Sequence, residues 1–576
     1  MNLNQKINRL LKFYMMKKCI SIFFIFNYLV SFEISDAIGY NGAVASSKKE
    51  ASNIGIEILQ RGGNAIDAAV AVGFALSVVH PSAGNIGGGG FMVIRFSNGE
   101  VTSIDFRETA PLQSNRDMFL DDKLEVIQGM SKYSGKACGV PGTVYGLGYA
   151  HEKYGTMSWE SLLYPSIQLA KYGFSLDYHN FKLLNSPRYS NFLSQDAESK
   201  KIFTKNNEPY KLNELFIQSD LAHTLIRIAK YGYNEFYNGI TADYIVDCMN
   251  RVGGIISYED LKSYKAIERE PIKINYRNHV IYSMPLPSSG GITLSNILNQ
   301  IENVNLSEFE VGSAKFIHLL SEVEKRSYAD RAEFLGDSDF INVPLQKLIS
   351  KEYADDRFST ISMKKAIPSK KIGHGNIDFW NESEETTHFS IVDKYGNAVS
   401  LTTTVNGWFG NGITVDNAGF LLNNEMDDFS IKPGYPNLYG LVGNEANSIQ
   451  PNKRMLSSMT PTIVENENNE LIYVLGTPGG STIITSVAQI LINLIDFNMP
   501  LKEAVSRKRF HHQWLPDVIQ VEKNYFSPEV ISRLEKYGHK VSERSSIGEA
   551  NCIYIDGTGL KYSTSDSRRG GVSKAY

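Results

Sequence analysis

The stretch TTHFSIVDKYGNAVSLTTTV, residues 386 to 405, holds two segments that alternate like β-strands on either side of the tripeptide at 394 to 396. A three-residue hairpin loop favours a left-handed residue at its end, where glycine is the natural choice. Pairing symmetric about Tyr395 places Thr386 opposite Thr404, with both side chains on one face of the sheet. The stretch therefore predicts an antiparallel hairpin that joins two hydroxyl groups, and a slip of one residue is the alternative register.

The segment before this hairpin, residues 360 to 385, is polar and irregular and predicts an exposed connector. A threonine at such a junction is by itself an ordinary strand former. It becomes reactive if the preceding bond is cut, because its hydroxyl can then use its own α-amino group as a base. An α-amine has a pKa of about 7.7 to 8.0, which suits a general base. We interpret the connector as a processing site, with Glu385 and Thr386 flanking the cut and Thr386 as the nucleophile.

The remainder of the chain predicts a layered α/β protein. Residues 46 to 84 are typical of two helices, the first ended by Gly62-Gly63 and the second capped by Asn64. The glycines at 87 to 90 precede a strand rather than a helix, so they favour close backbone packing over phosphate binding. Further strands are predicted after the connector, including GFLLNN at 419 to 424, and helices flank the strands on both sides of it.

The composition is that of an ordinary globular protein of 576 residues, with 42% hydrophobic and 21% charged residues. The 58 basic and 62 acidic residues nearly balance, so nucleic acid is not expected as a partner. Cys138, Cys248 and Cys552 would remain after removal of a leader, which indicates no disulfide framework and leaves one bridge open. Neither a CxxC motif nor a Cys/His metal spacing is present, so we predict no metal and no cofactor.

The first 36 residues are typical of a secretory signal peptide. A basic lead precedes the apolar run CISIFFIFNYLVSF at 19 to 32, which is too short to span a bilayer comfortably. Met15 or Met16 would give a more typical start. We expect cleavage between Ser31 and Ala37, export to the periplasm or the medium, and no membrane span afterwards. An uncleaved anchor is the alternative.

Six motifs that occur in the order typical of one family carry a resemblance to it: TTHFSIVDKYGNAVSLTTTVN, GFLLNNEMDDFS, NKRMLSSMTPTIV, GTPGGSTIIT, RFHHQWLPD and DFRETAP. From about Gly39 to Tyr576 the chain resembles the gamma-glutamyltranspeptidases, self-processing members of the N-terminal nucleophile hydrolases. The resemblance implies a mixed α/β fold, a four-layer αββα sandwich with two stacked antiparallel-rich sheets. It also implies autocleavage of a zymogen between Glu385 and Thr386. The products would be a large chain, 37 to 385, and a small catalytic chain, 386 to 576, that stay together as a heterodimer.

The resemblance also assigns the groups that would carry the chemistry. Thr386 would be the nucleophile, and Thr404 would orient it. Gly479 and Gly480 would offer backbone N–H groups as an oxyanion hole, because a tetrahedral intermediate needs preorganised donors and glycine permits close approach.

The remaining assignments concern substrate binding. Arg107 would clamp a carboxylate and Tyr439 would gate a lid loop. The other residues divide into hydroxyl donors for the carboxylate, Ser457 and Ser458, and groups that would hold the ammonium, Asn406, Glu425 and Asp428. Each has an ordinary alternative, such as a surface ion pair for the arginine, a helix cap for the aspartate or a turn for the serines.

The activity that the resemblance implies is gamma-glutamyl transfer and glutathione hydrolysis without an external cofactor. Glutathione, glutamine or a related donor would form a γ-glutamyl ester on Thr386, which water or an amino acid or peptide acceptor would then take. The rival readings are an acylase of the same fold that cleaves glutaryl amides, and an exported binding protein that never cuts itself.

Overall fold

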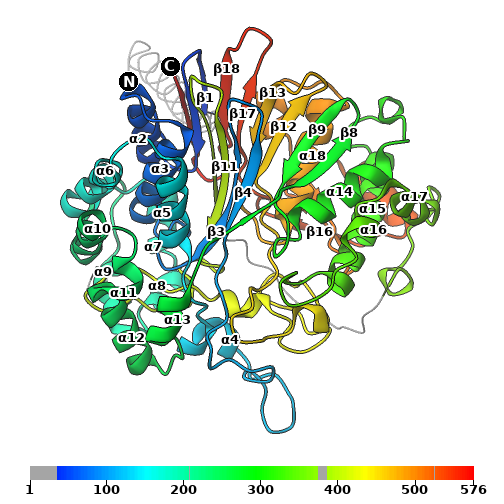
Figure 1. Cartoon of the computed structure of the whole chain (residues 1–576). Helices are drawn as coiled ribbons and strands as arrows, with labels where there is room; N and C mark the ends of the chain where they lie inside the picture. The colour runs from blue at the N-terminus through cyan, green and yellow to red at the C-terminus, as the bar shows by residue number, and fades with distance from the viewer. Residues whose placement is uncertain (1–34, 206–207, 374–385, 525) are drawn as a thin grey trace, which may run out of the picture.

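Two seven-stranded antiparallel sheets stack face to face between two layers of helices, as the computed structural model shows for residues 35–205, 208–373, 386–524 and 526–576 (Figure 1). The first sheet runs, in spatial order, β1 (Ser35–Gly39), β18 (Lys561–Ser565), β17 (Asn551–Ile555), β13 (Leu471–Leu475), β12 (Thr462–Asn466), β9 (His279–Ser283) and β8 (Ile272–Tyr276). The second runs β19 (Val572–Ala575), β2 (Ala43–Ser46), β10 (Thr387–Val392), β11 (Ala398–Thr404), β3 (Gly89–Arg95), β4 (Val101–Phe106) and β7 (Ile267–Arg269). The predicted αββα sandwich is confirmed.

The helices form the two outer layers. Those over the second sheet are α2 (Lys49–Gln60), α3 (Ala65–Val79), α5 (Thr143–Tyr154), α6 (Trp159–Tyr172) and α10 (Ser219–Tyr231), with shorter helices α7 (Tyr178–Leu184), α8 (Pro187–Leu193), α9 (Ala197–Phe203), α11 (Glu235–Asn238), α12 (Ile240–Val252) and α13 (Tyr258–Ser263) on the same side. On the other side lie α14 (Gly290–Ile301), α15 (Ala314–Phe334), α16 (Leu345–Leu348), α17 (Lys351–Ser359), α18 (Thr482–Ile495), α19 (Leu501–Ser506) and α20 (Pro528–Tyr537).

Alternation along the strands of the second sheet divides the core into two parts. On β3, Met92 and Ile94 pack into the cluster with α3 and α5, while Phe91 and Val93 pack into the cluster with the first sheet. Both faces of this sheet are therefore buried, because successive strand side chains point to opposite faces.

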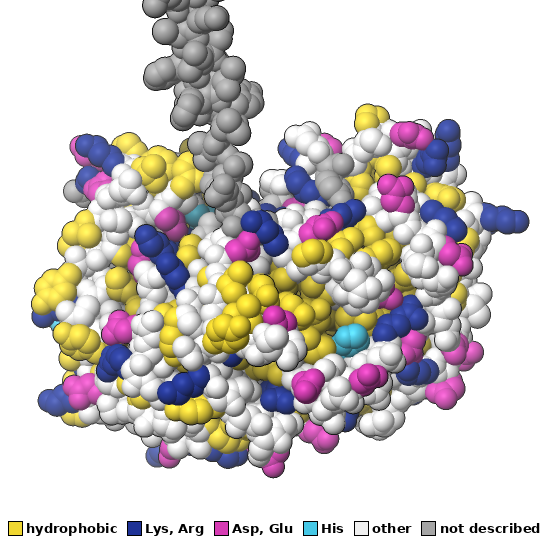
Figure 2. Space-filling view, turned by 90° about the horizontal axis from the view of Figure 1, so that it is seen from above, with side chains coloured by type: hydrophobic (Ala, Val, Ile, Leu, Met, Phe, Trp, Pro, Cys, Tyr) yellow, Lys and Arg dark blue, Asp and Glu magenta, His cyan; other side chains and the backbone are white. Residues whose placement is uncertain are grey.

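The hairpin has the predicted register. β10 pairs with β11 from Thr387 opposite Thr403 to Val392 opposite Ala398, which is symmetric about residue 395. Gly396 has a φ of +92° at the end of the loop. The same register places Thr386 opposite Thr404, at the end of the strands away from the loop. Figure 2 looks onto the loop end of the sheets, where charged side chains of both signs surround a central hydrophobic group.

The predicted start of the fold is also confirmed. α2 ends before Gly62, whose φ is +97°, and Asn64 caps α3 through the amides of residues 66 and 67. A Cβ added at any of the glycines from 87 to 90 would lie 2.0–2.4 Å from a backbone oxygen or 2.5 Å from the Glu108 carboxylate. Close packing of the chain is therefore the reason for this glycine run.

One predicted strand is wrong. Residues 419 to 424 form a loop with a single bridge between Thr414 and Leu421. The side chain of Asn423 takes the place of a ladder partner, because its amide donates to the carbonyls of Gly87 and Gly139, each at 2.8 Å. The small sheets β14 (Phe510–His511), β15 (Ile519–Glu522), β16 (Val541–Arg544) and β5 (Phe174–Ser175), β6 (Leu215–Phe216) were not anticipated from the sequence.

The two predicted chains interleave in both sheets. β10 and β11, which follow the predicted cut, lie between β2 and β3, which precede it. In the other sheet β12 pairs with β9 across the same division. The cut itself stays a prediction, because Glu385 lies outside the described residues. The large interface that the two predicted chains share in both sheets would keep them together after the cut.

The predicted signal peptide, residues 1 to 36, lies outside the described residues up to residue 34. Its proposed boundary falls inside β1, where Ser35 and Asp36 pair with Ser565 and Thr564. In the part of the chain that the structure describes, no helix has the length and hydrophobicity needed to cross a bilayer. Cys138, Cys248 and Cys552 are buried and free, so the bridge left open by the sequence is not formed among them.

Candidate active site

A cavity lies at the ends of β10 and β11 opposite the hairpin loop, and it gathers most of the predicted site residues. Its lining includes Arg107, Thr386, Thr404, Asn406, Glu425, Asp428, Tyr439, Ser457, Ser458 and Gly480, together with Arg331, Leu441, Met459 and Ile483. The volume open to the centre of a water molecule is about 20 Å³, which is close to the space that one water needs. Gly479 does not line the cavity, and Glu385 lies outside the described residues.

The two predicted hydroxyl residues lie side by side at this end of the hairpin. Thr386 and Thr404 are both buried, at 3% exposure, and both face the cavity. The backbone N–H of Asn406 donates to Oγ1 of Thr404 at 2.8 Å and fixes that hydroxyl. The strand pairing predicted from the loop therefore places the hydrogen-bonded hydroxyl of Thr404 beside Thr386, the proposed nucleophile.

The glycine pair lies just before the N-terminus of α18, and the first turn of this helix lies near the cavity. Gly479 has a φ of +142° and Gly480 a φ of +53°, which are conformations that favour glycine. A Cβ at Gly480 would lie 2.3 Å from the ring of Tyr439. The amide N–H groups at this helix N-terminus create a positive potential that suits a developing negative charge.

Arg107 follows the end of β4 and sits among three carboxylates. Its guanidinium lies 2.5 Å from Oε2 of Glu425 and 2.6 Å from Oδ2 of Asp428, and 3.6 Å from Glu108. Burial alone would lower the pKa of Arg107, but Glu425, Asp428 and Glu108 raise it overall. The arginine is therefore a buried ion-paired residue, and the alternative of a surface ion pair is wrong.

The carboxylates around Arg107 have oxygen atoms without hydrogen-bond partners. Among the residues that the structure describes, no hydrogen-bond partner is found for either oxygen of Glu108 or of Glu425, although Glu425 forms an ion pair with Arg107. Burial raises the pKa of Glu108 to about 8 and raises the pKa values of Glu425 and Asp428. The site has spare acceptors, as an ammonium pocket requires. Glu108 was missed from the sequence, although it directly follows Arg107.

Ser457 and Ser458 also line the cavity. The N–H of Met459 donates to Oγ of Ser457 at 3.1 Å, and the guanidinium of Arg331 donates to Oγ of Ser458 at 3.2 Å. Arg331 belongs to α15 and also donates to Oγ of Ser289 at 2.9 Å. Sequence reasoning missed Arg331, because a charged helix is usually expected to face solvent.

Tyr439 also lines the cavity. Its hydroxyl donates to the carbonyl of Asn406 at 2.9 Å, and its own carbonyl accepts from Gln513 at 3.0 Å. Asn437 holds the loop on which it stands, since its side-chain oxygen accepts from the N–H groups of Tyr439 and Leu441. The same side chain donates to Asp428 at 2.8 Å, so the loop and the ammonium-binding candidates form one network.

Histidine chemistry does not compete for the role of base. His388, two residues beyond Thr386, is fully buried between the hydroxyls of Thr402 and Ser390. Burial lowers its pKa to about 3, which makes it a weak base, and it does not line the cavity. It therefore holds the strands together rather than exchanging protons with substrate.

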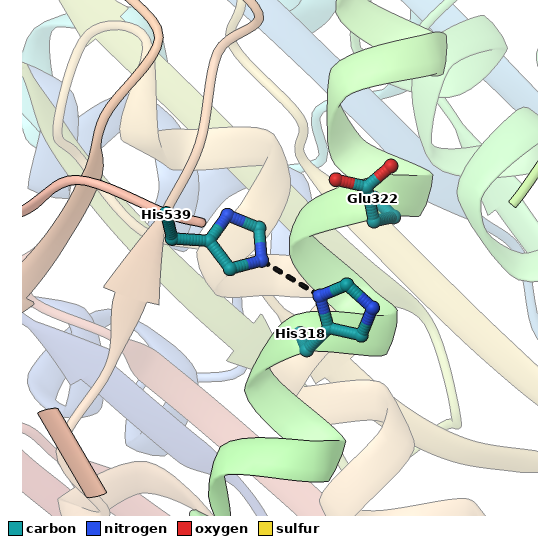
Figure 3. A group of neighbouring side chains, drawn as sticks. All are labelled: His318, Glu322 and His539. Carbon is teal, nitrogen blue, oxygen red and sulfur yellow. Dashed lines mark hydrogen bonds between the residues drawn. The ribbon is translucent and has the colours of Figure 1, made fainter. Parts of the chain in front are cut away.

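A second buried polar cluster, His318, Glu322 and His539, contains atoms that all lie within 4.8 Å of one another and resembles a metal site in composition (Figure 3). Its atoms already have protein partners. Nδ1 of His318 lies 2.7 Å from Nε2 of His539, and Nε2 of His318 bonds the carbonyl of Ser362.

The carboxylate of this cluster is also engaged, because Lys325 lies 2.8 Å from one oxygen of Glu322 and Arg326 lies 3.0 Å from the other. Two cations beside the carboxylate would oppose a bound metal ion. Burial lowers the pKa of His318 and lowers that of His539 to about 2. These features fit a neutral hydrogen-bonded pair that joins α15 to the segment after α20.

Comparison with known proteins places the chain. The Gamma-glutamyltranspeptidase family model matches residues 51–576. The glutathione hydrolase proenzyme of Escherichia coli (strain K12) is 48% identical over 529 residues, which cover 92% of this chain and 90% of that protein. The Pseudomonas aeruginosa protein of the same name is 44% identical over 542 residues, covering 92% and 94%.

Solved structures agree on the architecture. The gamma-glutamyltranspeptidase of Helicobacter pylori has a TM-score of 0.56 and 45% identity, covering 57% of this chain and 93% of that one. A cephalosporin acylase from Bacillus halodurans has a TM-score of 0.82 and 24% identity over 94% of this chain and 97% of its own, which shows a shared fold alone. The fold is that of an N-terminal nucleophile hydrolase. The chain belongs to the gamma-glutamyltranspeptidase family.

Proposed function

We propose that this chain is a precursor that cuts itself before Thr386 and then works as a gamma-glutamyltransferase and glutathione hydrolase. The observation that carries the proposal is the cavity in which Thr386 and Thr404 stand beside Arg107, Asp428 and Glu425. A nucleophile, a cation and paired acids in one buried space match a γ-glutamyl group, which has a reactive carbonyl at one end and a zwitterion at the other. The relatives in Escherichia coli and Pseudomonas aeruginosa bear the name glutathione hydrolase proenzyme.

The processing step has independent support. The match to the Helicobacter structure covers 93% of that solved chain but 57% of this chain, as expected if the relative consists of more than one chain. Cleavage between Glu385 and Thr386 would give a large chain, 37 to 385, and a small chain, 386 to 576. Their strands alternate within both sheets, so the products would form a heterodimer without a covalent link.

In the first chemical step, the new α-amino group of Thr386 accepts the proton of its own hydroxyl while Oγ1 attacks the γ-carbonyl carbon of the donor. The carbonyl electrons move to its oxygen, which the N–H groups at Gly479 and Gly480 stabilise. The intermediate collapses, the amine leaves with the proton, and a γ-glutamyl ester of Thr386 remains. Thr404 keeps the nucleophile oriented through its fixed hydroxyl.

In the second step, water or the amine of an amino acid or peptide attacks the ester carbonyl and passes a proton to the α-amine. The proton then returns to Oγ1 of Thr386 as the ester bond breaks. Hydrolysis gives glutamate, and transfer gives a new γ-glutamyl amide. Neither step needs an external cofactor.

Recognition of the α-amino acid end follows from an ion pair that lines the cavity. Arg107 and Asp428 pair with each other at 2.6 Å. A zwitterionic substrate would replace that pair, with its carboxylate on Arg107 and the hydroxyls of Ser457 and Ser458. Its ammonium would contact Asp428, Glu425 and Asn406. The exchange preserves the number of buried charge contacts, which limits the cost of binding.

The lid must open for this exchange. The cavity has room for about one water, whereas a γ-glutamyl group is several times larger. Tyr439 would gate entry by breaking its bond to the carbonyl of Asn406. We also propose export through the signal peptide at residues 1 to 36, with glutathione and glutamine as donors outside the inner membrane.

Intact mass spectrometry after incubation at neutral pH tests the proposal, with Thr386→Ala as the matched control. We expect two chains, the smaller beginning at Thr386, and one uncut chain in the control. Release of the amine from γ-glutamyl-p-nitroanilide should appear together with the cut. A single uncut chain in both samples would overturn the mechanism and favour the binding-protein reading.

A further inference from the structure

The cavity contains a second arginine, which forms no ion pair with any of the described residues. Arg331 on α15 is 5% exposed and lines the cavity with Thr386. Its guanidinium donates to the hydroxyls of Ser289 and Ser458. Among the residues that the structure describes, no carboxylate lies within ion-pair distance of it. Burying a charge without a counter-ion costs free energy, so the burial of Arg331 lowers the stability of the folded protein.

The direction of these hydrogen bonds decides what Ser458 can do. An arginine side chain donates and never accepts, so Oγ of Ser458 must be the acceptor of the bond from Arg331. Its own O–H is then left to donate. The oxygen of Ser457 likewise accepts a hydrogen bond, from the N–H of Met459, so its O–H is also left to donate. Two serine hydroxyls that line one cavity are thus both set as donors.

The two arginines differ in what they have left to offer. Arg107 lies within 2.6 Å of both Asp428 and Glu425 and within 3.6 Å of Glu108, so acids around it outnumber its charge. Arg331 donates hydrogen bonds to neutral hydroxyls on the serine side of the cavity, and the attraction of Asp428 for it acts at longer range than an ion pair. An anion bound by Ser457 and Ser458 would neutralise it.

We propose that Arg331 is a positioning residue that makes the enzyme select substrates with a free α-carboxylate. It does so by polarising Ser458 and by supplying the positive charge of the carboxylate pocket. The inference rests on the proposed function, because it assumes that a γ-glutamyl donor occupies this cavity. It adds to Arg107 a second positive charge that takes part in recognition of the carboxylate.

The test compares two ligands that differ by one carboxylate. γ-Glutamyl-p-nitroanilide carries it, and 4-aminobutanoyl-p-nitroanilide is the same molecule without it. In Arg331→Gln we expect KM for the first to rise about tenfold with kcat changed less than threefold, since a hydrogen bond involving a charged group contributes about 1.5–3 kcal/mol. The inhibition constant of the second should stay the same. Arg331→Lys should recover part of the loss.

Two controls separate recognition from folding. Ser458→Ala leaves the arginine in place and should raise KM for the carboxylate donor in the same direction, even if Arg331→Gln does not fold. Arg326→Gln removes another buried arginine of α15, which bonds Glu322 and Thr360 and does not line the cavity. It should lower stability and leave KM unchanged.

The outcomes are distinct. If the unmodified protein does not turn over γ-glutamyl-p-nitroanilide, the proposed function fails. If it does, and Arg331→Gln weakens both ligands equally or lowers kcat at constant KM, the role of Arg331 in selecting the carboxylate is overturned. Unchanged kinetics for both ligands would overturn it as well.

Discussion

The cavity around Arg107 and the cluster around His318 are both buried and polar, yet they differ in how completely their groups are paired. Around Arg107, both oxygens of Glu108 and of Glu425 lack hydrogen-bond partners among the described residues. In the cluster, the atoms of His318 and Glu322 are bonded to neighbouring side chains and carbonyls. Unpaired buried polar groups are expensive, so a fold keeps them where a ligand will pair with them.

The largest effect should come from the carboxylate that would hold the ammonium. Asp428→Asn keeps the shape of the side chain and removes its charge, so kcat/KM for γ-glutamyl-p-nitroanilide should fall about a hundredfold, as for truncation of a buried charge pair. Steady-state kinetics on the processed protein would measure this. Glutaryl-p-nitroanilide lacks the α-amino group and is the matched control, because its slow turnover should not fall.

The opposite result would favour the rival hypothesis, an acylase of the same fold that cleaves glutaryl amides. If Asp428→Asn left γ-glutamyl turnover intact, or if the unmodified protein preferred the glutaryl donor, the ammonium pocket would have no function. The cavity would then bind a simple acyl chain, and its unpaired carboxylates would need another explanation.

The sequence predicts some parts of this site and not others, for physical reasons. The pairing of Thr386 with Thr404 follows from local loop chemistry, since a three-residue turn ending in Gly396 allows few registers. Arg331 could not be found in this way. It lies on a helix rich in charged residues, and α15 becomes buried through packing against distant elements that no local pattern encodes.

The fold shows the same division. The helices before β3 and their caps are set by nearby residues such as Asn64, and they were predicted correctly. Residues 419 to 424 read as a strand, but Asn423 bonds the carbonyls of Gly87 and Gly139, which lie far away in sequence. Glu108 stands beside Arg107 in the sequence, yet its isolation from hydrogen-bond donors depends on the whole cavity.

The second effect concerns the paired cluster and should appear in stability rather than activity. His539→Ala leaves Nδ1 of His318 buried without its partner at 2.7 Å. The free energy of unfolding should fall by about 2 kcal/mol, the typical cost of an unsatisfied buried group. Urea unfolding would measure it, while kcat/KM for γ-glutamyl-p-nitroanilide should stay within a factor of two. A large loss of activity with normal stability would show that the cluster takes part in catalysis.

A third effect separates the two regions by the sign of their pH dependence. Burial raises the pKa of Glu108 to about 8, so the folded protein holds a proton that the unfolded chain releases above its ordinary pKa near 4.5. The contribution of Glu108 to stability therefore falls as pH rises from about 4.5 to 8. Burial lowers the pKa of His539 to about 2, so its contribution falls as pH drops from about 6.5 toward 2.

Glu108→Gln should therefore flatten the stability profile between pH 5 and pH 8 and leave the acid limb unchanged, because glutamine has no proton to lose. His539→Gln should do the reverse and reduce the loss of stability as pH falls below about 6.5. Urea titrations of both variants and the unmodified protein at several pH values would measure these slopes. If both variants changed the same limb, the contrast between an unpaired acidic cavity and a neutral histidine pair would be wrong, since only opposite shifts in pKa give opposite slopes.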